Sequence, residues 1–396
     1  MELTVVVAPG LEPTTLAEIR ALGASAEVEE SGVIALRGDE DLICRLNIHL
    51  RTATRVLVRA APFRAASFAE LERRAREVEW ERVVSGETPL RLRVTCRKSR
   101  LYHSDAVAER VARSVSQRLG VQVEWSSSGE GDTRSDALSD AQLVVVRLVR
   151  DICTVSFDSS GAALHARGYR QAVAKAPLRE SLAAAMILAS EWAGDTPFLD
   201  PMCGSGTIPI EAALIARRIA PGTRRAFGFE RWPGHRGDRL AEWRERALAA
   251  ELATAPAGIH ASDRDAGAVR ATLGNAERAG VQHDISVAQV TIAQLDPPAG
   301  PPGWVVTNPP YGVRVGQRGP LPALYKRFGL VLRERFPGWN VALLSVDPRL
   351  ERAMVLPLRE LFRTRNGGIP VRCMTALIGL PDAHNAPARS GSPQAG

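Results

Sequence analysis

The chain has 396 residues, of which 45% are hydrophobic and 24% are charged, enough for two or three domains that each bury a core. No apolar stretch approaches the roughly 20 residues that span a bilayer, and the N-terminal residues MELTVVVAPG contain no basic leader, so we expect a cytoplasmic protein. Five cysteines without a C-x-x-C pair and seven scattered histidines argue against a disulfide framework and against a bound metal.

The formal net charge of +7 is distributed unevenly along the chain. Eight basic residues face two acidic ones between positions 91 and 120, and seven face two between positions 217 and 239. Two separate basic stretches suit an extended anion, such as a nucleic acid, better than a small metabolite. Either stretch alone is also compatible with an ordinary solvated surface.

Residues 1–60 predict a small α/β module of ferredoxin-like type. Its expected elements are, in order, a strand at 3–7, a helix at 16–22, a strand at 33–36, a helix at 39–47 and a strand at 55–58. Residues 61–159 predict a second α/β unit, with helices at 68–78 and 104–119 and strands at 90–94, 142–148 and 152–157. The polar stretch 126–139 is expected to be a surface loop.

From residue 160 to 381, apolar strands alternate with helices, which is typical of a doubly wound and mostly parallel sheet. The expected strands are 197–200, 258–263, 304–307 and 340–346. A hairpin of 361–365 with 371–380, turning at Asn366-Gly367-Gly368, should add antiparallel strands at the sheet edge. An insertion occupies about 217–257, and residues 382–396 lack periodicity, so a disordered tail is expected there.

A strand ending at Asp200 runs into a Gly-rich turn at 201–207 and then into a helix at 208–219. The glycines at this turn let backbone amides approach a ligand, and the helix N-terminus offers the positive end of its dipole. Because neither G-x-G-x-x-G nor G-K-[ST] is present, hydride transfer and ATP chemistry are disfavoured. Asp263 ends the next expected strand and could accept from a ribose diol, with capping of helix 266–279 as its structural alternative.

Asn308-Pro309-Pro310-Tyr311 follows the apolar strand 304–307. The two prolines fix φ and carry no N–H, which leaves the Asn308 side-chain oxygen and the Pro309 carbonyl as acceptors for one amino group. Tyr311 adds a ring that could stack on a flat base. Two purely structural roles are the alternatives: an Asn-Pro that only starts a turn, and a Tyr311 that faces the core.

Together these motifs resemble the class I S-adenosylmethionine-dependent methyltransferases, of the branch whose Asn-Pro-Pro-Tyr turn methylates exocyclic amines. Longer segments are similar to the THUMP-domain guanine-N2 RNA methyltransferases, whose known types act on bacterial 23S ribosomal RNA and on transfer RNA. These segments are 10–12, 51–56, 98–104 (KSRLYHS), 164–170, 176–180, 200–213, 219–222, 229–232 and 307–313. The resemblance covers almost the full chain. It implies ferredoxin-like and THUMP modules followed by a Rossmann-like, seven-stranded methyltransferase domain with an antiparallel last strand.

The resemblance also implies the residues of the site. S-adenosylmethionine would be held by Asp200, Met202, Cys203, Gly204, Ser205, Gly206, Thr207, Asp263, Arg264, Thr291 and Asn308. The target amine would be held by Asn308, Pro309, Pro310 and Tyr311. Relatives usually carry an acid after the third strand to bind the adenine amino group, whereas this chain offers Thr291 or Gln289. Cys203 could be a nucleophile, as in cytosine-C5 methyltransferases, but its place directly before Gly204 favours a small packed residue.

Two groups of residues are expected to contact RNA: Arg97, Lys98 and Arg100 in the second unit, and Arg224, Arg225, Arg231 and Trp232 in the insertion. Trp232 is equally suited to pack the insertion onto the catalytic domain. The predicted substrate is a guanine in structured RNA, with 23S ribosomal RNA favoured and transfer RNA as the alternative. A DNA adenine-N6 methyltransferase and a catalytically silent RNA-binding protein remain as rival interpretations.

Overall fold

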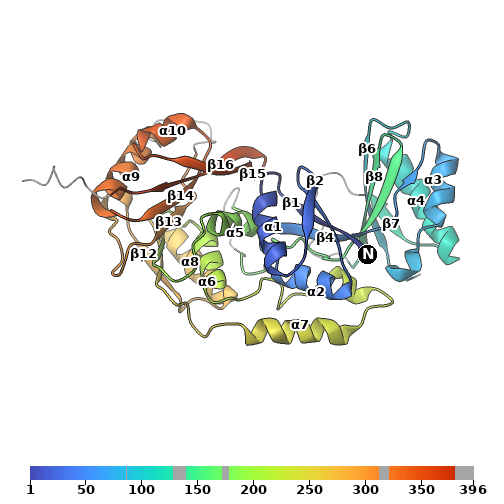
Figure 1. The fold of residues 1–396 in the computed structure, drawn as a ribbon, viewed down its shortest axis with the longest axis horizontal. Coiled ribbons are helices and arrows are strands. Elements are labelled where there is room, and N and C mark those ends of the chain that lie inside the picture. The colour runs from blue at the N-terminus through green and yellow to red at the C-terminus, as the bar shows by residue number, and fades with distance from the viewer. Residues whose placement is uncertain (86, 128–139, 172–177, 312–320, 380–396) are drawn as a thin grey trace, which may run out of the picture.

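The computed structural model describes residues 1–85, 87–127, 140–171, 178–311 and 321–379, which form two β-sheets with helices packed around them (Figure 1). Most of the expected loop 126–139 and all of the expected tail 382–396 lie outside these ranges, as do parts of the segments 176–180 and 307–313. Within the described ranges, no helix is long and apolar enough to cross a membrane.

The first sheet joins the two N-terminal units. Within the described residues it has nine strands, in the order β2-β3-β1-β4-β9-β8-β6-β7, with β5 paired to β9. The strands are β1 (Glu2–Val7), β2 (Ala26–Glu30), β3 (Val33–Arg37), β4 (Ala53–Arg59), β5 (Phe63–Arg64), β6 (Leu90–Arg97), β7 (Trp125–Ser127), β8 (Gln142–Val149) and β9 (Ile152–Asp158). Because β4 pairs with β9, the first module continues into the second unit without a break in the sheet.

Helices α1 (Glu12–Ala21) and α2 (Glu40–His49) belong to the first module, and α3 (Phe68–Arg76), the short η1 (Trp80–Arg82) and α4 (Ser104–Leu119) belong to the second unit. Sequence patterning predicted these four α-helices but missed the short strands β5 and β7, of which β7 contains residues 126–127 of the expected loop, and it missed β2. That strand reads Ala-Glu-Val-Glu-Glu and is almost entirely exposed at the edge of the sheet, so it lacks the apolar alternation that marks a half-buried strand.

The second sheet has seven strands within the described residues, in the order β12-β11-β10-β13-β14-β16-β15. They are β10 (Phe198–Asp200), β11 (Ile259–Asp263), β12 (Ile285–Gln289), β13 (Trp304–Thr307), β14 (Asn340–Ser345), β15 (Arg359–Asn366) and β16 (Ile369–Leu377). The first five are parallel, and β16 and β15 form the antiparallel hairpin that the sequence predicted. The chain order reverses between β10 and β13, where ligand crevices open in sheets of this kind.

Around this sheet lie α5 (Glu180–Ala189), α6 (Thr207–Ala216), α8 (Ala266–Ala279), η4 (Ile292–Gln294), α9 (Leu321–Arg335) and α10 (Pro348–Ala353). The insertion contains η3 (Gly228–Arg231) and α7 (Gly237–Ala249), and α7 runs alongside α2 of the first module (Figure 1). There Arg239 pairs with Asp41 at 2.7 Å, and the Arg45 guanidinium lies 5.3 Å from the centre of the Trp243 ring. The insertion therefore packs on the N-terminal half of the chain.

A buried polar network fixes the first module against the half of the chain that forms the second sheet. Arg167 and Glu211 form an ion pair at 3.2 Å with both side chains almost fully buried, and the Tyr169 hydroxyl donates to Glu211 at 3.0 Å. Arg167 also donates to the Arg51 carbonyl at 2.8 Å, while Arg51 donates to the Ile219 carbonyl at 2.7 Å. Breaking a buried ion pair costs about 3–5 kcal/mol, so this junction is expected to be rigid. Because Glu211 lies on α6, the junction reaches the helix that follows the Gly-rich turn.

Candidate active site

Three of the predicted residues meet at the carboxyl edge of the second sheet. Asp200 ends β10, Asp263 ends the neighbouring β11, and Asn308 follows directly after β13 on the other side. The Thr307 hydroxyl donates to the buried Asp200 carboxylate at 2.7 Å, which ties the start of the Asn-Pro-Pro-Tyr turn to the start of the Gly-rich turn. The Gly-rich turn and the Asn-Pro-Pro-Tyr turn thus lie beside each other at one edge of the sheet.

The Gly-rich turn depends on glycine at two positions for different reasons. Gly206 has φ +83°, and a Cβ there would lie 2.7 Å from a methyl group of Thr272 on α8. Gly204 has φ +55°, and a Cβ there would meet no atom within 4 Å. Gly204 therefore leaves open space beside the turn, as a backbone that cradles a ligand requires.

Two residues of α8 that the sequence did not single out hold this turn in place. The Thr272 hydroxyl donates to the Gly204 carbonyl at 3.0 Å, and the Asn275 amide donates to the Ser205 carbonyl at 2.8 Å. Both side chains are fully buried. The sequence feature that could have identified them is their i, i+3 spacing on the helix that follows Asp263, which places both polar side chains on one face of that helix.

Asp263 is bound to the Gly-rich turn and does not cap α8. One carboxylate oxygen accepts from Gly204 N at 3.0 Å and the other from Asp265 N at 3.0 Å. The α8 N-cap is Asp265, whose side chain accepts from Gly267 N at 2.6 Å, so the capping alternative for Asp263 is wrong. An ionised carboxylate has about four acceptor sites, which leaves Asp263 capacity for a diol.

Burial raises the pKa of Asp200 from 3.8 to about 7, although hydrogen bonds from Thr307 and from Met202 N favour the carboxylate form. The nearby charge of Asp263 also raises the pKa. The folded protein consequently binds a proton at Asp200 more tightly than the unfolded chain does. Ionisation of Asp200 should therefore cost stability as the pH rises from about 4 to about 7.

An Asp200→Asn protein should lack this part of the pH dependence, because its amide does not ionise. We expect its melting temperature, measured without cofactor by thermal unfolding, to fall less between pH 5 and pH 8 than that of the unsubstituted protein. Asp195→Asn, at an exposed position on the preceding loop, is the matched control and should leave the pH dependence unchanged. Equal slopes for the Asp200→Asn and unsubstituted proteins would contradict the assignment.

Cys203 is buried within the Gly-rich turn, with its Sγ 3.5 Å from the Thr272 hydroxyl oxygen. Burial raises the pKa of this thiol, which disfavours the thiolate that a nucleophile needs. These contacts agree with the small packed residue that the sequence favoured.

The Asn-Pro-Pro-Tyr turn is organised by hydroxyl groups. The Tyr311 hydroxyl donates to Asn308 Oδ1, and the Tyr325 hydroxyl donates to the Pro310 carbonyl at 3.4 Å. Asn308 Oδ1 has two lone pairs, so it can accept from Tyr311 and from a ligand amino group together. The Tyr311 ring is partly buried against the main core, and burial raises the pKa of its hydroxyl. The ring therefore contacts the core, as its alternative interpretation expects, while part of it stays accessible to solvent.

The two candidate contacts for an adenine amino group lie at the carboxyl end of β12. Gln289 is the last residue of that strand and pairs in register with Asp263. Its Nε2 donates to the Arg264 carbonyl at 3.0 Å, which leaves the amide oxygen as the acceptor. Thr291 lies at the N-cap position of η4 without a side-chain capping bond, and its hydroxyl donates to Gln294 Oε1 at 2.8 Å. Both side chains are exposed, and Gln289 is the nearer to Asp263 along the sheet.

Comparison with known proteins identifies the family. Residues 167–373 match the RMKL-like methyltransferase domain, and residues 2–57 match the RlmL ferredoxin-like domain. The chain belongs to the RMKL-like methyltransferases. The expected combination of a ferredoxin-like module with a Rossmann-like methyltransferase fold is thereby confirmed.

Two relatives and two solved structures are similar to this RMKL-like methyltransferase over almost its full length. It is 33% identical to slr0064 of Synechocystis sp., a candidate RNA methyltransferase, over 92% of this chain and 93% of that protein. It is 33% identical to the ribosomal RNA large subunit methyltransferase K/L of Alteromonas mediterranea over 93% of this chain, but spans only 53% of that protein. The structure of SMU.472 in complex with SAH is 26% identical, covers 96% of this chain and 98% of that one, and has a TM-score of 0.84. A Listeria monocytogenes protein described as a predicted N6-adenine-specific DNA methylase is 31% identical over 94% of this chain and 95% of that one, with a TM-score of 0.78.

The RNA-contacting residues predicted for the second unit of the RMKL-like methyltransferase lie together. Arg97 ends β6, and Lys98 and Arg100 are exposed on the loop that leads to α4. Lys98 has φ +50°, and the Arg100 side chain lies 3.7 Å from Asp151. This loop presents its basic side chains to solvent at one end of the first sheet.

The insertion residues predicted to contact RNA divide into two kinds. Arg224 and Arg231 are exposed, and Arg224 pairs with Glu251 at 3.2 Å. Arg225 is partly buried and donates to the carbonyls of residues 162 and 163, and burial lowers its pKa to about 10. The Trp232 indole donates to Gln142 at the start of β8 at 2.9 Å and packs against two hydrophobic clusters. Arg225 and Trp232 therefore have structural roles, and Trp232 joins the insertion to the second unit.

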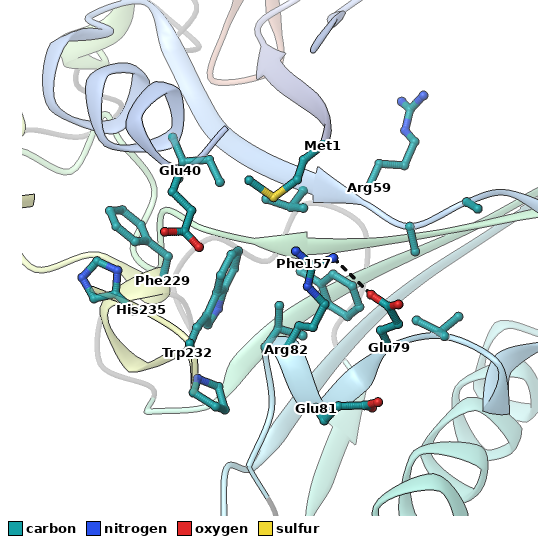
Figure 2. A pocket seen from close by; sticks show the side chains of 18 of the residues that line it. Met1, Glu40, Arg59, Glu79, Glu81, Arg82, Phe157, Phe229, Trp232 and His235 are labelled. Atoms are coloured by element: carbon teal, nitrogen blue, oxygen red, sulfur yellow. Dashed lines mark hydrogen bonds and ion pairs between the residues drawn. The ribbon is translucent and has the colours of Figure 1, made fainter. Parts of the chain in front are cut away.

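A cleft of about 1050 Å³ lies where the first module, the second unit and the insertion meet (Figure 2). Trp232 and His235 border it on one side and Arg82 on another, and Arg82 pairs with Glu79 at 3.1 Å. None of the predicted cofactor-binding or amine-holding residues lines this cleft. The sequence motifs place methyl transfer at the carboxyl edge of the second sheet, away from this cleft.

Proposed function

We propose that this chain transfers a methyl group from S-adenosylmethionine to the exocyclic N2 amine of a guanine in structured RNA, with 23S ribosomal RNA as the favoured substrate. The observation that carries the proposal is the Asn-Pro-Pro-Tyr turn joined to the Gly-rich turn through Thr307 and Asp200. Family membership and the RNA methyltransferase relatives support the same activity.

The residues present fit S-adenosylmethionine. Open space beside Gly204, backbone amides at the start of α6 and the Asp263 carboxylate together provide a place for a nucleoside and its charged tail. When bound, the cofactor supplies an electrophilic methyl group on a sulfonium. The proposed cofactor contacts are Asp200, Met202, Cys203, Gly204, Ser205, Gly206, Thr207, Asp263, Arg264, Thr291 and Asn308.

The chain's own contribution to the reaction is the placement of a weak nucleophile. The guanine 2-amino nitrogen shares its lone pair with the ring, so it attacks poorly unless its geometry is fixed. Asn308 Oδ1 and the Pro309 carbonyl each accept one N–H, which turns the lone pair toward the methyl group for an in-line displacement. Tyr311 offers the extruded base a stacking face, a contact of about 1–3 kcal/mol.

We further propose that the chain divides into a ferredoxin-like module at 1–60, a THUMP RNA-binding unit at 61–159 and a methyltransferase domain at 160–381. Arg97, Lys98 and Arg100 contact RNA phosphates in the second unit, and Arg224 and Arg231 do so from the insertion. Arg225 and Trp232, which also donate hydrogen bonds within the chain, complete the proposed RNA-contacting set. A cytoplasmic location, where ribosomal and transfer RNA are modified, belongs to the same proposal.

RNA affinity should fall steeply with salt, and a Lys98→Ala/Arg100→Ala protein should show a weaker salt dependence. The slope of log K against log [salt] is negative, and each lost phosphate contact reduces its steepness by about 1, so the double substitution should make it less steep by about 2. Titrations of RNA between 50 and 200 mM salt measure this slope. Arg37→Ala, at an exposed position of β3, is the control. An unchanged slope in the double variant would remove this loop from the RNA surface.

The activity itself is tested by incubating total RNA from a deletion strain with the protein and labelled S-adenosylmethionine, then identifying the labelled nucleoside. We expect N2-methylguanosine in the 23S fraction. The same nucleoside in transfer RNA alone would select the alternative substrate.

A second candidate is DNA adenine-N6 methylation, because the Listeria relative is described in those terms and the same four-residue turn can hold an adenine amine. Genomic DNA from the same strain, incubated in parallel, tests it directly. Methyladenine in DNA would replace the RNA proposal, and label in neither nucleic acid would favour a silent RNA-binding protein.

A further inference from the structure

The cleft at the meeting point of the first module, the second unit and the insertion has an apolar floor and a volume of about 1050 Å³ (Figure 2). Phe157 of β9 and Phe229 of η3 are buried there, and the His235 ring meets the Phe229 ring nearly perpendicularly with 5.1 Å between their centroids. Ligand sites are typically concave and mostly apolar, with a few placed polar groups and volumes of about 300–1,000 Å³. This cleft is therefore large enough for a nucleotide.

Trp232 presents an aromatic ring of fixed orientation to this cleft. Its indole N–H donates to the Gln142 side chain at 2.9 Å, and the Gln142 amide donates in turn to the carbonyls of Leu143 and Asp158, each at 2.9 Å. The Phe229 ring packs against the indole at 6.3 Å with the two planes 69° apart. The Trp232 side chain nevertheless stays partly exposed and lines the cleft. A ring that is already oriented can stack on a base at little cost in conformational entropy.

Two of the arginines that line the cleft are available to bind an anion. Six arginines line it, and four of them form ion pairs with carboxylates. Arg64 on β5 and Arg236 at the start of α7 are exposed, and within the described ranges their side chains have no ion-pair or hydrogen-bond partner. A guanidinium binds phosphate through charge-assisted hydrogen bonds. The four paired arginines are Arg59, Arg74, Arg82 and Arg239.

One carboxylate of the cleft also has no partner. Glu77, Glu79 and Glu81 each pair with an arginine. Glu40, the first residue of α2, is exposed, and its side chain forms no ion pair or hydrogen bond within the part of the chain that the structure describes. Figure 2 shows this carboxylate pointing into the cleft, toward Trp232. A carboxylate only accepts hydrogen bonds, so Glu40 favours a ligand that offers donors.

These groups together match an unpaired guanine nucleotide. Guanine presents its N1–H and its 2-amino group side by side on the Watson–Crick edge, so one carboxylate can accept from both. Inosine and uridine offer a single N–H at that edge. The edge and the ring faces of a base are accessible only when the base is unpaired and unstacked, as in RNA loops, bulges and ends. The phosphates that flank such a nucleotide carry the negative charge that suits Arg64 and Arg236.

We propose that this cleft binds an unpaired guanine nucleotide of the substrate RNA, at a site separate from the methyl-transfer turn. Trp232 stacks on the base and Glu40 accepts from its Watson–Crick edge. Arg64 and Arg236 bind the flanking phosphates, and the exposed Arg231 continues the same basic surface along the insertion. The inference rests on the proposed function, which makes RNA the substrate. Because three parts of the chain contribute residues, the site is complete only when they are packed together.

Glu40→Gln tests the recognition of the base edge, and Glu40 has no ion pair whose loss would disturb the fold. Uridine pentanucleotides with a central guanosine or a central inosine differ only in the 2-amino group. The unsubstituted protein should bind the guanosine probe about 5- to 100-fold more tightly, and Glu40→Gln should bring this ratio close to one because glutamine presents one acceptor and one donor. Glu27→Gln, on the exposed strand β2 outside the cleft, is the matched control and should keep the ratio. An unchanged ratio in Glu40→Gln would overturn the proposal.

The place of binding is tested by photocrosslinking. A guanosine pentanucleotide with 5-bromouridine beside the guanosine should crosslink to the segment 229–236, as shown by mapping the crosslinked peptide. Trp232→Ala should weaken binding of the probe about 5- to 100-fold, the loss typical of one stacked base. Because Trp232 also joins the insertion to the second unit, the crosslink in the unsubstituted protein is the deciding measurement. Crosslinks confined to peptides outside the cleft would overturn the proposal.

A free nucleotide is distinguished from a segment of RNA by competition with guanosine 5′-monophosphate. The pentanucleotide should bind more tightly, because its additional phosphates contact Arg64 and Arg236. Arg64→Ala/Arg236→Ala should remove most of that advantage. Equal affinities of the two ligands for the unsubstituted protein would identify a free nucleotide as the occupant and would overturn the assignment to RNA.

Asn308→Ala separates this site from the methyl-transfer turn. The variant should keep the preference for guanosine over inosine, because Asn308 does not line the cleft. Loss of the preference in Asn308→Ala would place the guanine at the methyl-transfer turn and would overturn this inference. A protein that binds the guanosine probe in the cleft but forms no N2-methylguanosine would instead overturn the proposed function, so the two failures are distinguishable.

Discussion

An Asn308→Ala protein should transfer methyl groups to RNA at least about 100-fold more slowly, while its affinity for S-adenosylmethionine should fall only a few-fold because Asn308 is one of several proposed cofactor contacts. Alanine removes the side-chain acceptor that turns the target nitrogen toward the methyl group, and leaves the Gly-rich turn and Asp263 intact. Single-turnover methylation at saturating cofactor measures the rate, and equilibrium titration measures the affinity. Raising the cofactor concentration should not restore the rate.

The control for this experiment is Asn340→Ala. Asn340 begins β14 at the amino edge of the same sheet, opposite the site, and is half-buried like Asn308. It should retain its rate, which would show that loss of an asparagine from this sheet is not harmful in itself. Undiminished turnover by Asn308→Ala would mean that the Asn-Pro-Pro-Tyr turn is only a turn.

Sequence patterning located most of the strands that have one buried face, but the helices α5 and α9, which also have buried faces, were not predicted individually. The parallel strands that carry Asp200 and Asp263, and the closing hairpin, are apolar enough to be recognised from the sequence. The edge strand β2 is not, because almost all of its side chains meet solvent. The sequence also leaves the start of α8 ambiguous, because Asp263 and Asp265 both precede it. The structure shows that Asp265 is the N-cap.

Residues that reach the site from distant parts of the chain could not be predicted from sequence spacing alone. Thr272 and Asn275 hydrogen-bond a turn about 70 positions upstream, a contact that only the packing of α8 against that turn reveals. Composition alone also left the contacts of the insertion open. Arg225 and Trp232 were predicted to contact RNA, with packing as the alternative for Trp232, and the structure shows that both donate hydrogen bonds within the chain.

Asp263→Ala should weaken S-adenosylmethionine binding without touching the methyl-transfer step. A carboxylate that accepts from both ribose hydroxyls makes two charge-assisted hydrogen bonds of about 1.5–3 kcal/mol each, so their loss should raise the Kd by about two orders of magnitude or more. Because Asp263 also holds Gly204 N at 3.0 Å, the turn should loosen in the same variant. Isothermal titration measures the affinity, and kcat at saturating cofactor should recover most of its original value.

Asp265→Ala is the matched control, two positions along the same loop. It removes the α8 cap, which costs about 1 kcal/mol of stability, but leaves the Asp263 carboxylate in place. The pair should therefore separate cleanly: a lower melting temperature with normal cofactor affinity for Asp265→Ala, and a large loss of affinity for Asp263→Ala. If Asp263→Ala bound the cofactor normally, its carboxylate would serve only to hold the Gly-rich turn, and the ribose contact would have to come from elsewhere in the crevice. Asn308→Ala differs from both variants because excess cofactor rescues a binding defect and cannot rescue a misplaced amine.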